Sequence, residues 1–476
     1  MTYLLVALAF AGLFVFLFLS PKTKVLVSFL LMMSLFDCVP NVMFGYFVWD
    51  AGIALLFFSW VHLTLTGESS YVYTDPHVRL LKVFVCWMLF SLVWSLVVYQ
   101  YPLMLTMKAS RQLILGYVSF FILLRLFEEK GDSLQFLLKA FYWLSYLLLA
   151  VGMVQYALKV EILFGLIKEY DGVLRALPIF LPFSHLFMWY ILSRYLAARQ
   201  TSLHEIMYVV LTLVATLTTF TRGIYLAILL SGIFILLVML LQGRLVLVRA
   251  VSALCVCILG LLLLFTTTDI LEKSMGRFAS ALTLMSEANR QVKKSADDTY
   301  TGRIGLMKER LDAVANKNPL VGFGFMHEDV YEKQRLPFRY GSVIYTPKYL
   351  KRYAYGHPYE LALHSADVGW QNLAIDTGLV GFALFLSILL ATFVRYFATS
   401  GLVAPDDYFL RLAFFVQIFT LAILMFNGNT YTNNVHIPAF MLAAFTWLTH
   451  RSRGNETAPE MGVGTNLISV RAGQPC

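Results

Sequence analysis

Long apolar runs recur along the whole chain, and they restrict the possible folds more than any other feature. About 20 helical residues cross a hydrocarbon core about 30 Å thick, and only helices and closed barrels satisfy their backbone hydrogen bonds there. The runs have this helical length, and only 14% of the residues are charged, against about 25% in soluble proteins. The sequence therefore predicts an all-α polytopic membrane protein embedded in a lipid bilayer, and it excludes soluble and nucleic-acid-binding classes.

Hydropathy predicts about 12–13 transmembrane helices, the lower number applying if the two short N-terminal runs do not both span. The predicted runs are 4–20, 24–38, 43–66, 80–99, 111–127, 134–158, 175–197, 206–221, 223–242, 245–266, 370–397, 409–427 and 436–449. The chain is thus divided into helices within 1–266, a large loop at 267–369, further helices within 370–450, and a polar tail at 451–476 that is predicted to be disordered.

Basic residues predict the orientation of these helices. With the N-terminus outside, nearly every inside connection has a pair of basic residues near it, such as Lys22 and Lys24. The exception is the inside connection 67–79, which has only Arg79. Outside connections such as 427–434 have no basic residue. Lysine and arginine in short loops favour the cytoplasmic side. This orientation places the loop 267–369 outside, and a loop of that length is usually functional. The five cysteines show no metal-ligand spacing, which predicts neither a disulfide nor a zinc site.

Arg222 is the only charge in the apolar tract from Ile206 to Leu241. As one helix this tract would be about 54 Å long, which exceeds the thickness of the hydrocarbon core, so we expect it to fold back. The sequence TTFTRG at 218–223 is the predicted break, with Gly223 taking the turn. Arg222 would then lie at the outer lipid boundary, where its guanidinium can bind a lipid-linked phosphate or diphosphate. An arginine that extends to ordinary headgroups explains the residue equally well when it is taken alone.

Two further stretches in or beside the outside loop carry candidate residues. A turn at 301–302 is predicted to precede a helix that ends near Ala315 and is followed by the glycine turn PLVGFG at 319–324. Arg303 and Arg310 are two helical turns apart and share one face, although arginines on a solvated face are the commoner explanation of such spacing. His364 stands before the next apolar run, where a histidine can serve as a general base, although an isolated interfacial histidine usually has no chemistry.

Three motifs in a fixed order resemble one known superfamily. They are TRG at 221–223, then GR at 302–303 with PLVGFG, then His364-Ser365 with IDTGLVG at 375–381. From about residue 216 to 386 the chain resembles the O-antigen ligase and O-antigen polymerase superfamily of bacterial envelope glycan assembly. It departs from the usual pattern in having Ser365 after the histidine and Met307 where a tryptophan is common.

The resemblance implies a membrane-embedded GT-C glycosyltransferase of the bacterial inner membrane, with its active site facing the periplasm. Its donor would be a glycan on undecaprenyl diphosphate. The implied catalytic residues are Arg222 and Arg303 at the diphosphate and His364 at the acceptor hydroxyl, with Arg310 in support and Arg111 and Lys108 near the lipid head. Two arginines can stabilise the leaving diphosphate without a metal ion, so we expect no metal and no cofactor, and transfer with inversion.

Three functions remain open. A polymerase that lengthens O-antigen, capsular or exopolysaccharide is slightly favoured because the aromatic stretch 339–360 could stack on sugar rings, although a plain loop core explains it as well. A ligase would move the finished glycan to lipid A core or another acceptor. A flippase or transporter would need ionisable residues deep in the bundle, and the candidates Asp50, His62 and His185 do not cluster in sequence. A polymerase implies a flippase and a chain-length regulator as further partners.

Overall fold

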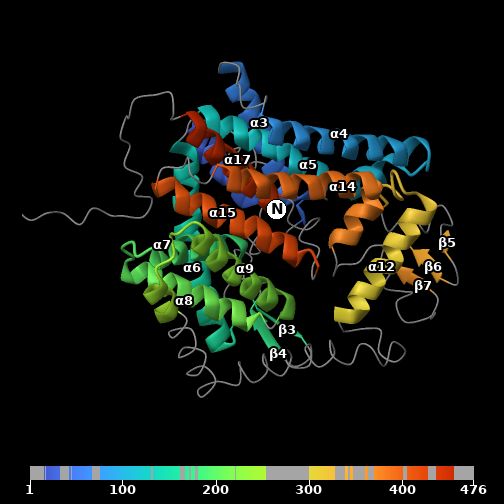
Figure 1. Cartoon of the computed structure of the whole chain (residues 1–476). Coiled ribbons are helices and arrows are strands. Elements are labelled where there is room, and N and C mark those ends of the chain that lie inside the picture. Colours follow the sequence, from blue (N-terminus) through green and yellow to red (C-terminus); the bar gives the residue numbers. More distant parts are fainter. Residues whose placement is uncertain are drawn as a thin grey trace, which may run out of the picture.

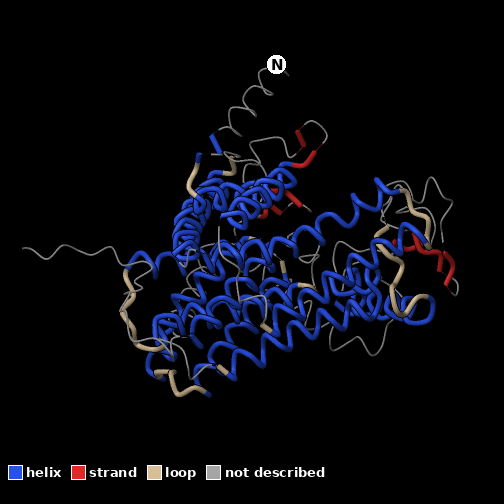
Figure 2. The backbone as a smooth tube through the Cα atoms, turned by 90° about the horizontal axis from the view of Figure 1, so that it is seen from above, coloured by secondary structure: helices blue, strands red, loops and turns tan. Residues whose placement is uncertain are grey.

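The structure is a computed structural model of the chain. It describes residues 15–16, 18–32, 42–43, 46–66, 75–129, 132–160, 167–170, 173–176, 181–219, 221–253, 300–326, 338–340, 343–346, 360–362, 369–399, 405–426 and 436–454. Helices make up most of this part of the chain and lie side by side as a bundle, with short strands at its edges (Figures 1 and 2).

Apart from α12, which lies in the predicted loop 267–369, the helices overlap the predicted apolar runs. They are α2 (Pro21–Met32), α3 (Val48–Thr66), α4 (Pro76–Val97), α5 (Leu103–Glu129), α6 (Asp132–Leu158), α7 (Leu181–Leu196), α8 (Leu203–Thr218), α9 (Arg222–Leu241), α12 (Tyr300–Lys317), α14 (Gly369–Ala398), α15 (Pro405–Leu424) and α17 (His436–Gly454). The predicted run 245–266 begins as helix at 247–253, and most of it, like most of 4–20, lies outside the described residues. The division of the chain into membrane helices and one large outside loop stays a prediction.

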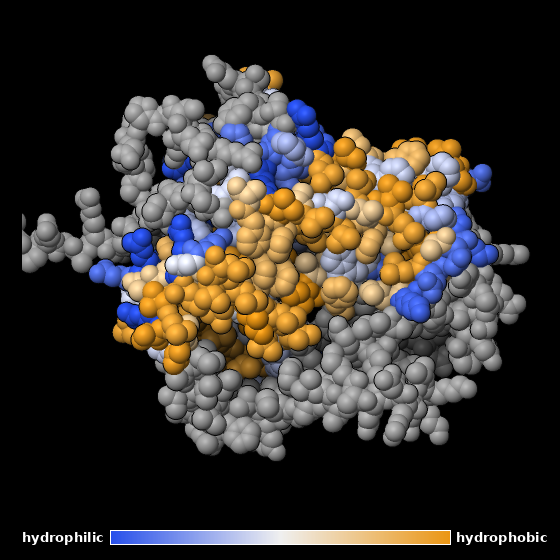
Figure 3. Space-filling view, viewed as in Figure 1, coloured by the Kyte–Doolittle hydropathy of each residue, from blue (hydrophilic) through white to orange (hydrophobic). Residues whose placement is uncertain are grey.

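Six helices among the described residues are long and apolar enough to cross a membrane: α4, α5, α6, α9, α14 and α15. Two shorter apolar helices lie at Ala51–His62 and Leu203–Thr218. Apolar side chains form a broad band across one face of the molecule, and hydrophilic side chains gather toward its ends (Figure 3). The prediction of an all-α polytopic membrane protein is confirmed.

Close packing holds the helices together, because lipid tails are as apolar as the helix surfaces and provide no hydrophobic drive for association. Four phenylalanines join α2, α6, α7 and α17, with ring centroids 5.0 Å apart for Phe29 and Phe440 and 4.7 Å apart for Phe141 and Phe183. Gly52 allows α3 to approach α2, since a Cβ there would lie 2.6 Å from the Met32 amide nitrogen.

Short strands lie in or beside connections that are predicted to be outside, and the sequence analysis predicted none of them. Residues 46–47 belong to the predicted helical run 43–66 but form a strand, so the helix begins later than predicted. The strands form two hairpins, β1 (Val42–Met43) with β2 (Tyr46–Phe47) and β3 (Ile167–Tyr170) with β4 (Val173–Ala176), and a sheet of β5 (Phe338–Tyr340), β6 (Val343–Thr346) and β7 (Glu360–Ala362). In that sheet β5 is antiparallel to β6, and β6 is parallel to β7 with Ile344 opposite Glu360. Tyrosine, valine and threonine suit such pleated surfaces.

Contacts bring the predicted inside connections together at one end of the bundle, here called the inner end. Lys22 forms an ion pair with Asp132, which joins the starts of α2 and α6. Asp75 caps α4 and accepts two hydrogen bonds from Arg395 near the end of α14, at 2.5 and 2.6 Å. Burial alone would raise the pKa of Asp75, but the hydrogen bonds and charge of Arg395 outweigh it and hold that pKa below its usual value.

The opposite end is here called the outer end. It contains the end of α4, the connection between α8 and α9, and the first turns of α14. The loop helix α12 and strands β5–β7 lie beyond the ends of α4 and α14 on this side (Figure 1).

Candidate functional site

The apolar tract 206–241 folds back as predicted, with α8 ending at Thr218 and α9 beginning at Arg222. The prediction that Gly223 takes the turn is wrong, because Gly223 belongs to α9 and the connection is Thr219–Thr221. Threonine side chains make this turn possible. Thr219 Oγ1 donates to the Thr216 carbonyl at 2.7 Å and accepts from the Thr221 amide at 3.3 Å, so groups left open at the helix ends find partners.

Arg222 is therefore the first residue of α9, with Thr221 as its N-cap. The side chain of Arg222 lies outside what the structure describes. The end of α8, just before this turn, contacts His185 of α7, whose Nε2 lies 2.9 Å from Thr216 Oγ1.

His185 is one of the three residues that a transporter was expected to use. Another, His62, is exposed, and the side chain of Asp50 is outside the described part.

The loop helix α12 spans Tyr300–Lys317, so it begins before the predicted turn at 301–302, which lies within its first helical turn. Arg303 is in that first turn, and its side chain is outside the described part of the structure. Arg310 is only 5% exposed, and its Nη1 donates to Oε1 of Gln371, the third residue of α14, at 3.4 Å. The solvated-face explanation is therefore wrong for Arg310, which faces the bundle.

The predicted glycine turn after α12 is confirmed, and it is the element that attaches α12 to the bundle. Gly322 and Gly324 both have φ of +72°, which favours glycine. The Phe323 amide donates to the Ile375 carbonyl at 2.8 Å, and the Leu379 amide donates to the Pro319 carbonyl at 2.9 Å. These two backbone bonds, in opposite directions, fix the turn against α14.

The partner of this turn is a break in α14 that the sequence analysis did not predict. Gly378 has φ +70° and ψ −176°, so α14 consists of two segments, 369–377 and 379–398. Such a break frees backbone groups, and a membrane helix tolerates it only where protein satisfies them. Ser91 Oγ donates to the Asp376 carbonyl at 2.6 Å, and Trp87 Nε1 donates to the Thr377 carbonyl at 2.8 Å. The motif IDTGLVG is thus the site of a break held by α4.

The end of α4 also holds the glycine turn. Tyr99 and Tyr101 donate from their hydroxyls to the Gly322 carbonyl at 2.7 Å and the Phe323 carbonyl at 3.2 Å. Burial raises the pKa of Tyr101, so its hydroxyl stays protonated and remains a donor. We call this three-way contact the outer junction: residues 318–326, residues 374–379 and residues 91–101. Sequence reasoning missed its α4 side, because nothing in the run 80–99 distinguishes these polar residues from ordinary helix positions.

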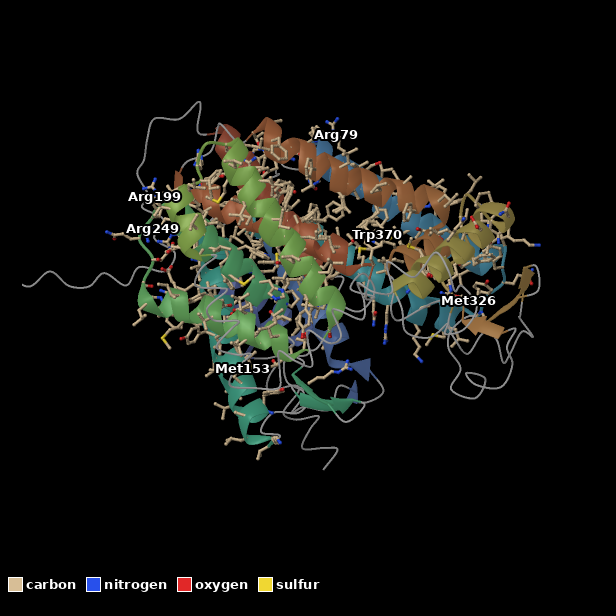
Figure 4. All side chains as sticks on the ribbon, turned by 60° about the horizontal axis from the view of Figure 1, so that its bottom comes forward. Arg79, Met153, Arg199, Arg249, Met326 and Trp370 are labelled. Carbon is tan, nitrogen blue, oxygen red and sulfur yellow. The ribbon has the colours of Figure 1, made fainter. Side chains whose placement is uncertain are left out.

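The start of α14 is fixed to a third element, the end of α15. The Gly369 amide donates to the Met425 carbonyl at 2.8 Å, and Trp370 Nε1 donates to the Ala422 carbonyl at 3.1 Å. Trp370 lies between the bundle and α12, with Met326 of the turn beyond it (Figure 4). His364 falls between the end of β7 and the start of α14, outside the described residues.

The same helix α15 packs against α9, the helix that begins at Arg222. Ser231 Oγ lies 2.7 Å from Thr420 Oγ1, and the rings of Phe234 and Phe419 stack with centroids 4.3 Å apart. Arg222 is nine residues before Ser231, about 13 Å further toward the outer end at 1.5 Å per residue. The helix that begins at Arg222, the helix that contains Arg303 and the segment that follows His364 therefore all lie toward the outer end of the bundle, and α15 contacts both the first and the last of them. Convergence of the three side chains themselves stays a prediction.

The remaining candidates lie on α5, which begins at the outer end. Lys108 is exposed and Arg111 is half-buried. Among the described residues, no group of three or more His, Cys, Asp or Glu side chains could hold a metal ion. The prediction of transfer without a metal remains to be tested.

The fold and these contacts define a class: a multi-pass membrane protein in which a loop helix is joined to a broken transmembrane helix. A family model described as O-antigen ligase matches residues 207–386, from α8 through the first half of α14. The matched segment contains all three motifs that carried the resemblance, so the similarity to the O-antigen ligase and polymerase superfamily is confirmed there. No curated protein matches the chain.

Proposed function

We propose that this protein is a membrane glycosyltransferase of the O-antigen ligase or polymerase type. It would transfer a glycan from undecaprenyl diphosphate to an acceptor hydroxyl at the periplasmic face of the bacterial inner membrane. The observation that carries the proposal is the outer junction. It joins α12, with Arg303 and the buried Arg310, to the segment of α14 that follows His364. The family match at 207–386 supports this type of activity.

In the proposed reaction the acceptor oxygen forms a bond to the anomeric carbon of the donor glycan. The bond from that carbon to the diphosphate oxygen breaks, and its electron pair leaves with undecaprenyl diphosphate. His364 takes the proton of the acceptor hydroxyl. Arg222 and Arg303 bind the diphosphate and stabilise its growing negative charge, which removes the need for a metal ion. A single displacement of this kind inverts the anomeric centre.

The burial of Arg310 gives it a supporting role in this site. Arg310 is 5% exposed and its guanidinium donates to Gln371, which fixes the rotation of α12, and Arg303 lies two helical turns away on the same face. Arg111 and Lys108 lie on α5 at the same end and would guide the lipid head.

Two acceptors are compatible with this chemistry. A polymerase would use another lipid-linked glycan, and the tyrosines in the sequences of β5 and β6 favour it because aromatic residues can stack on the sugars of a long chain. A ligase would use lipid A core, and the description of the matched family favours it. A deletion strain distinguishes the two: loss of a polymerase leaves single repeats on the acceptor, whereas loss of a ligase leaves full-length chains on undecaprenyl diphosphate.

The proposed roles separate donor binding from transfer. His364→Ala should lower the transfer rate by roughly two to four orders of magnitude, the usual size of a general-base contribution, and should still bind the lipid diphosphate. Arg222→Lys should be impaired in both, because lysine keeps the charge but loses the planar pair of donors. Donor binding and glycan transfer are measured separately on purified, inserted protein. Arg79→Lys and His62→Ala, two exposed positions on α4 and α3, are the matched controls. Near wild-type transfer by His364→Ala, or loss of its donor binding, would contradict the base assignment.

A further inference from the structure

We propose that the inner end carries a binding site for the headgroup of an anionic phospholipid, formed by Arg199, Arg244 and Arg249. This inference does not rest on the proposed glycosyl transfer. The three arginines come from separate segments: Arg199 follows α7, Arg244 follows α9, and Arg249 lies in the helical residues 247–253.

One backbone hydrogen bond brings these segments together. The Val246 amide donates to the Leu196 carbonyl at 3.0 Å. Arg199 is three residues past Leu196, while Arg244 and Arg249 are two residues before and three residues after Val246. Figure 4 shows Arg199 and Arg249 at the same edge of the bundle, away from Arg79.

Aromatic rings hold two of the guanidinium groups. The Arg249 guanidinium lies over the ring of Tyr195 at 5.1 Å, and the hydroxyl of that tyrosine lies 2.8 Å from Ser252 Oγ. The Arg244 guanidinium lies over the ring of Tyr408 at 3.9 Å. Cation–π contacts of this kind fix a guanidinium without neutralising its charge.

Within the part of the chain that the structure describes, none of the three arginines forms an ion pair with a carboxylate. Their neighbour Arg194 differs, since its Nη1 binds Glu205 Oε1 at 2.6 Å. The cluster therefore concentrates positive charge at the end of the bundle that the basic residues predict to be cytoplasmic, the side on which anionic lipid headgroups attract such residues.

Apolar side chains beside the arginines indicate a lipid rather than a free anion. Leu241, Leu247 and Val248 are 77%, 72% and 77% exposed. Leucine and valine at the rim of a membrane helix contact acyl chains, and guanidinium groups next to them are placed for the phosphodiester of the same molecule. A soluble phosphate would use the arginines alone and gain nothing from the apolar rim.

The test measures lipid binding to the purified full-length chain by native mass spectrometry. Phosphatidylglycerol is titrated against phosphatidylcholine with the same acyl chains. Wild type should bind phosphatidylglycerol more tightly. The triple variant Arg199→Gln, Arg244→Gln, Arg249→Gln should lose about a hundredfold in that affinity, since each basic residue near the surface contributes about fivefold. Arg79→Gln, which removes an exposed arginine elsewhere at the same end, is the matched control and should bind as wild type does.

A single variant guards against misfolding of the triple variant. Arg199→Gln leaves both stacked arginines intact and should lower the affinity for phosphatidylglycerol about fivefold. Equal affinity of wild type for the two lipids would overturn the proposal, as would a triple variant that binds phosphatidylglycerol as wild type does. Displacement of the bound lipid by millimolar inorganic phosphate would overturn it too, because the site would then be one for a soluble anion.

Discussion

Replacing Gly378 by alanine tests whether the outer junction positions the site. Gly378 has φ +70° and ψ −176°, a combination that only glycine adopts without strain. A Cβ at this position would also collide with the Leu320 carbonyl and would lie 2.6 Å from the Val321 amide nitrogen. Both contacts are to backbone atoms, which cannot rotate away. The alanine variant must therefore separate the glycine turn from α14 or close the break.

The size of the effect follows from these two causes. The unfavourable backbone conformation costs roughly 1–3 kcal/mol, and forcing extra volume into a packed site costs a similar amount. Together they remove roughly 2–6 kcal/mol from the free energy that holds the junction closed. Since 1.4 kcal/mol is a factor of ten, the population of the open junction should rise between about 30-fold and about 20 000-fold.

Hydrogen exchange of two amides reports this opening directly. The amides of Phe323 and Leu379 are bonded across the junction at 2.8 and 2.9 Å, and both should lose protection in Gly378→Ala by the factor above. Glycan transfer should fall with it, although no candidate catalytic residue is changed. Gly232→Ala in α9 is the control, because nothing lies within 4 Å of the added Cβ. Wild-type protection at Phe323 in Gly378→Ala would refute the reasoning.

Two further predictions concern the Asp75–Arg395 ion pair at the inner end and the metal requirement of glycan transfer. Asp75→Asn leaves the buried Arg395 without its partner and should cost about 3–5 kcal/mol of stability, measured as a lowered melting temperature. Asp132→Asn, which removes an exposed carboxylate from the ion pair with Lys22, should cost at most about 1 kcal/mol. The pKa of Asp75 is lowered in the folded state, so this stabilisation is complete above its unfolded pKa of about 3.9 and is lost as the pH falls through the lower folded value. Separately, glycan transfer by purified protein should persist in excess chelator; loss of turnover that magnesium or manganese restores would reject the arginine-only diphosphate site.

Periodicity and hydropathy predicted most of the helices, because a membrane span needs only length and apolar composition. The hairpin at 218–223 could be predicted for the same reason, since a tract that is too long for the bilayer must turn. The residues that form the turn could not be predicted. The conformational freedom of glycine pointed to Gly223, whereas the structure uses the hydroxyls of Thr219 and Thr221, which replace the hydrogen bonds lost at the helix ends.

The break in α14 illustrates a different limit. A single glycine in an apolar run is compatible with a straight helix, and the sequence of α14 alone does not distinguish the two. What decides the matter is a set of partners distant in sequence: Trp87 and Ser91 on α4, and Pro319 in the loop. Only the three together satisfy the groups freed at Gly378, so the break could be recognised only once the fold was known.

The motifs that carried the resemblance divide into two kinds. PLVGFG and IDTGLVG form backbone contacts with each other, and at Gly322 and Gly378 a side chain would both strain φ and strike backbone atoms. These motifs specify the scaffold. Arg222, Arg303 and His364 lie beside that scaffold, at the start of α9, in the first turn of α12 and before α14. Because the contacts between the turn and α14 run between backbone atoms, they fix the relative position of the elements whatever side chains stand at 303 and 364. A departure such as Ser365 can therefore change the chemistry of the site while its framework stays the same, and variants at these positions test the reaction separately from the fold.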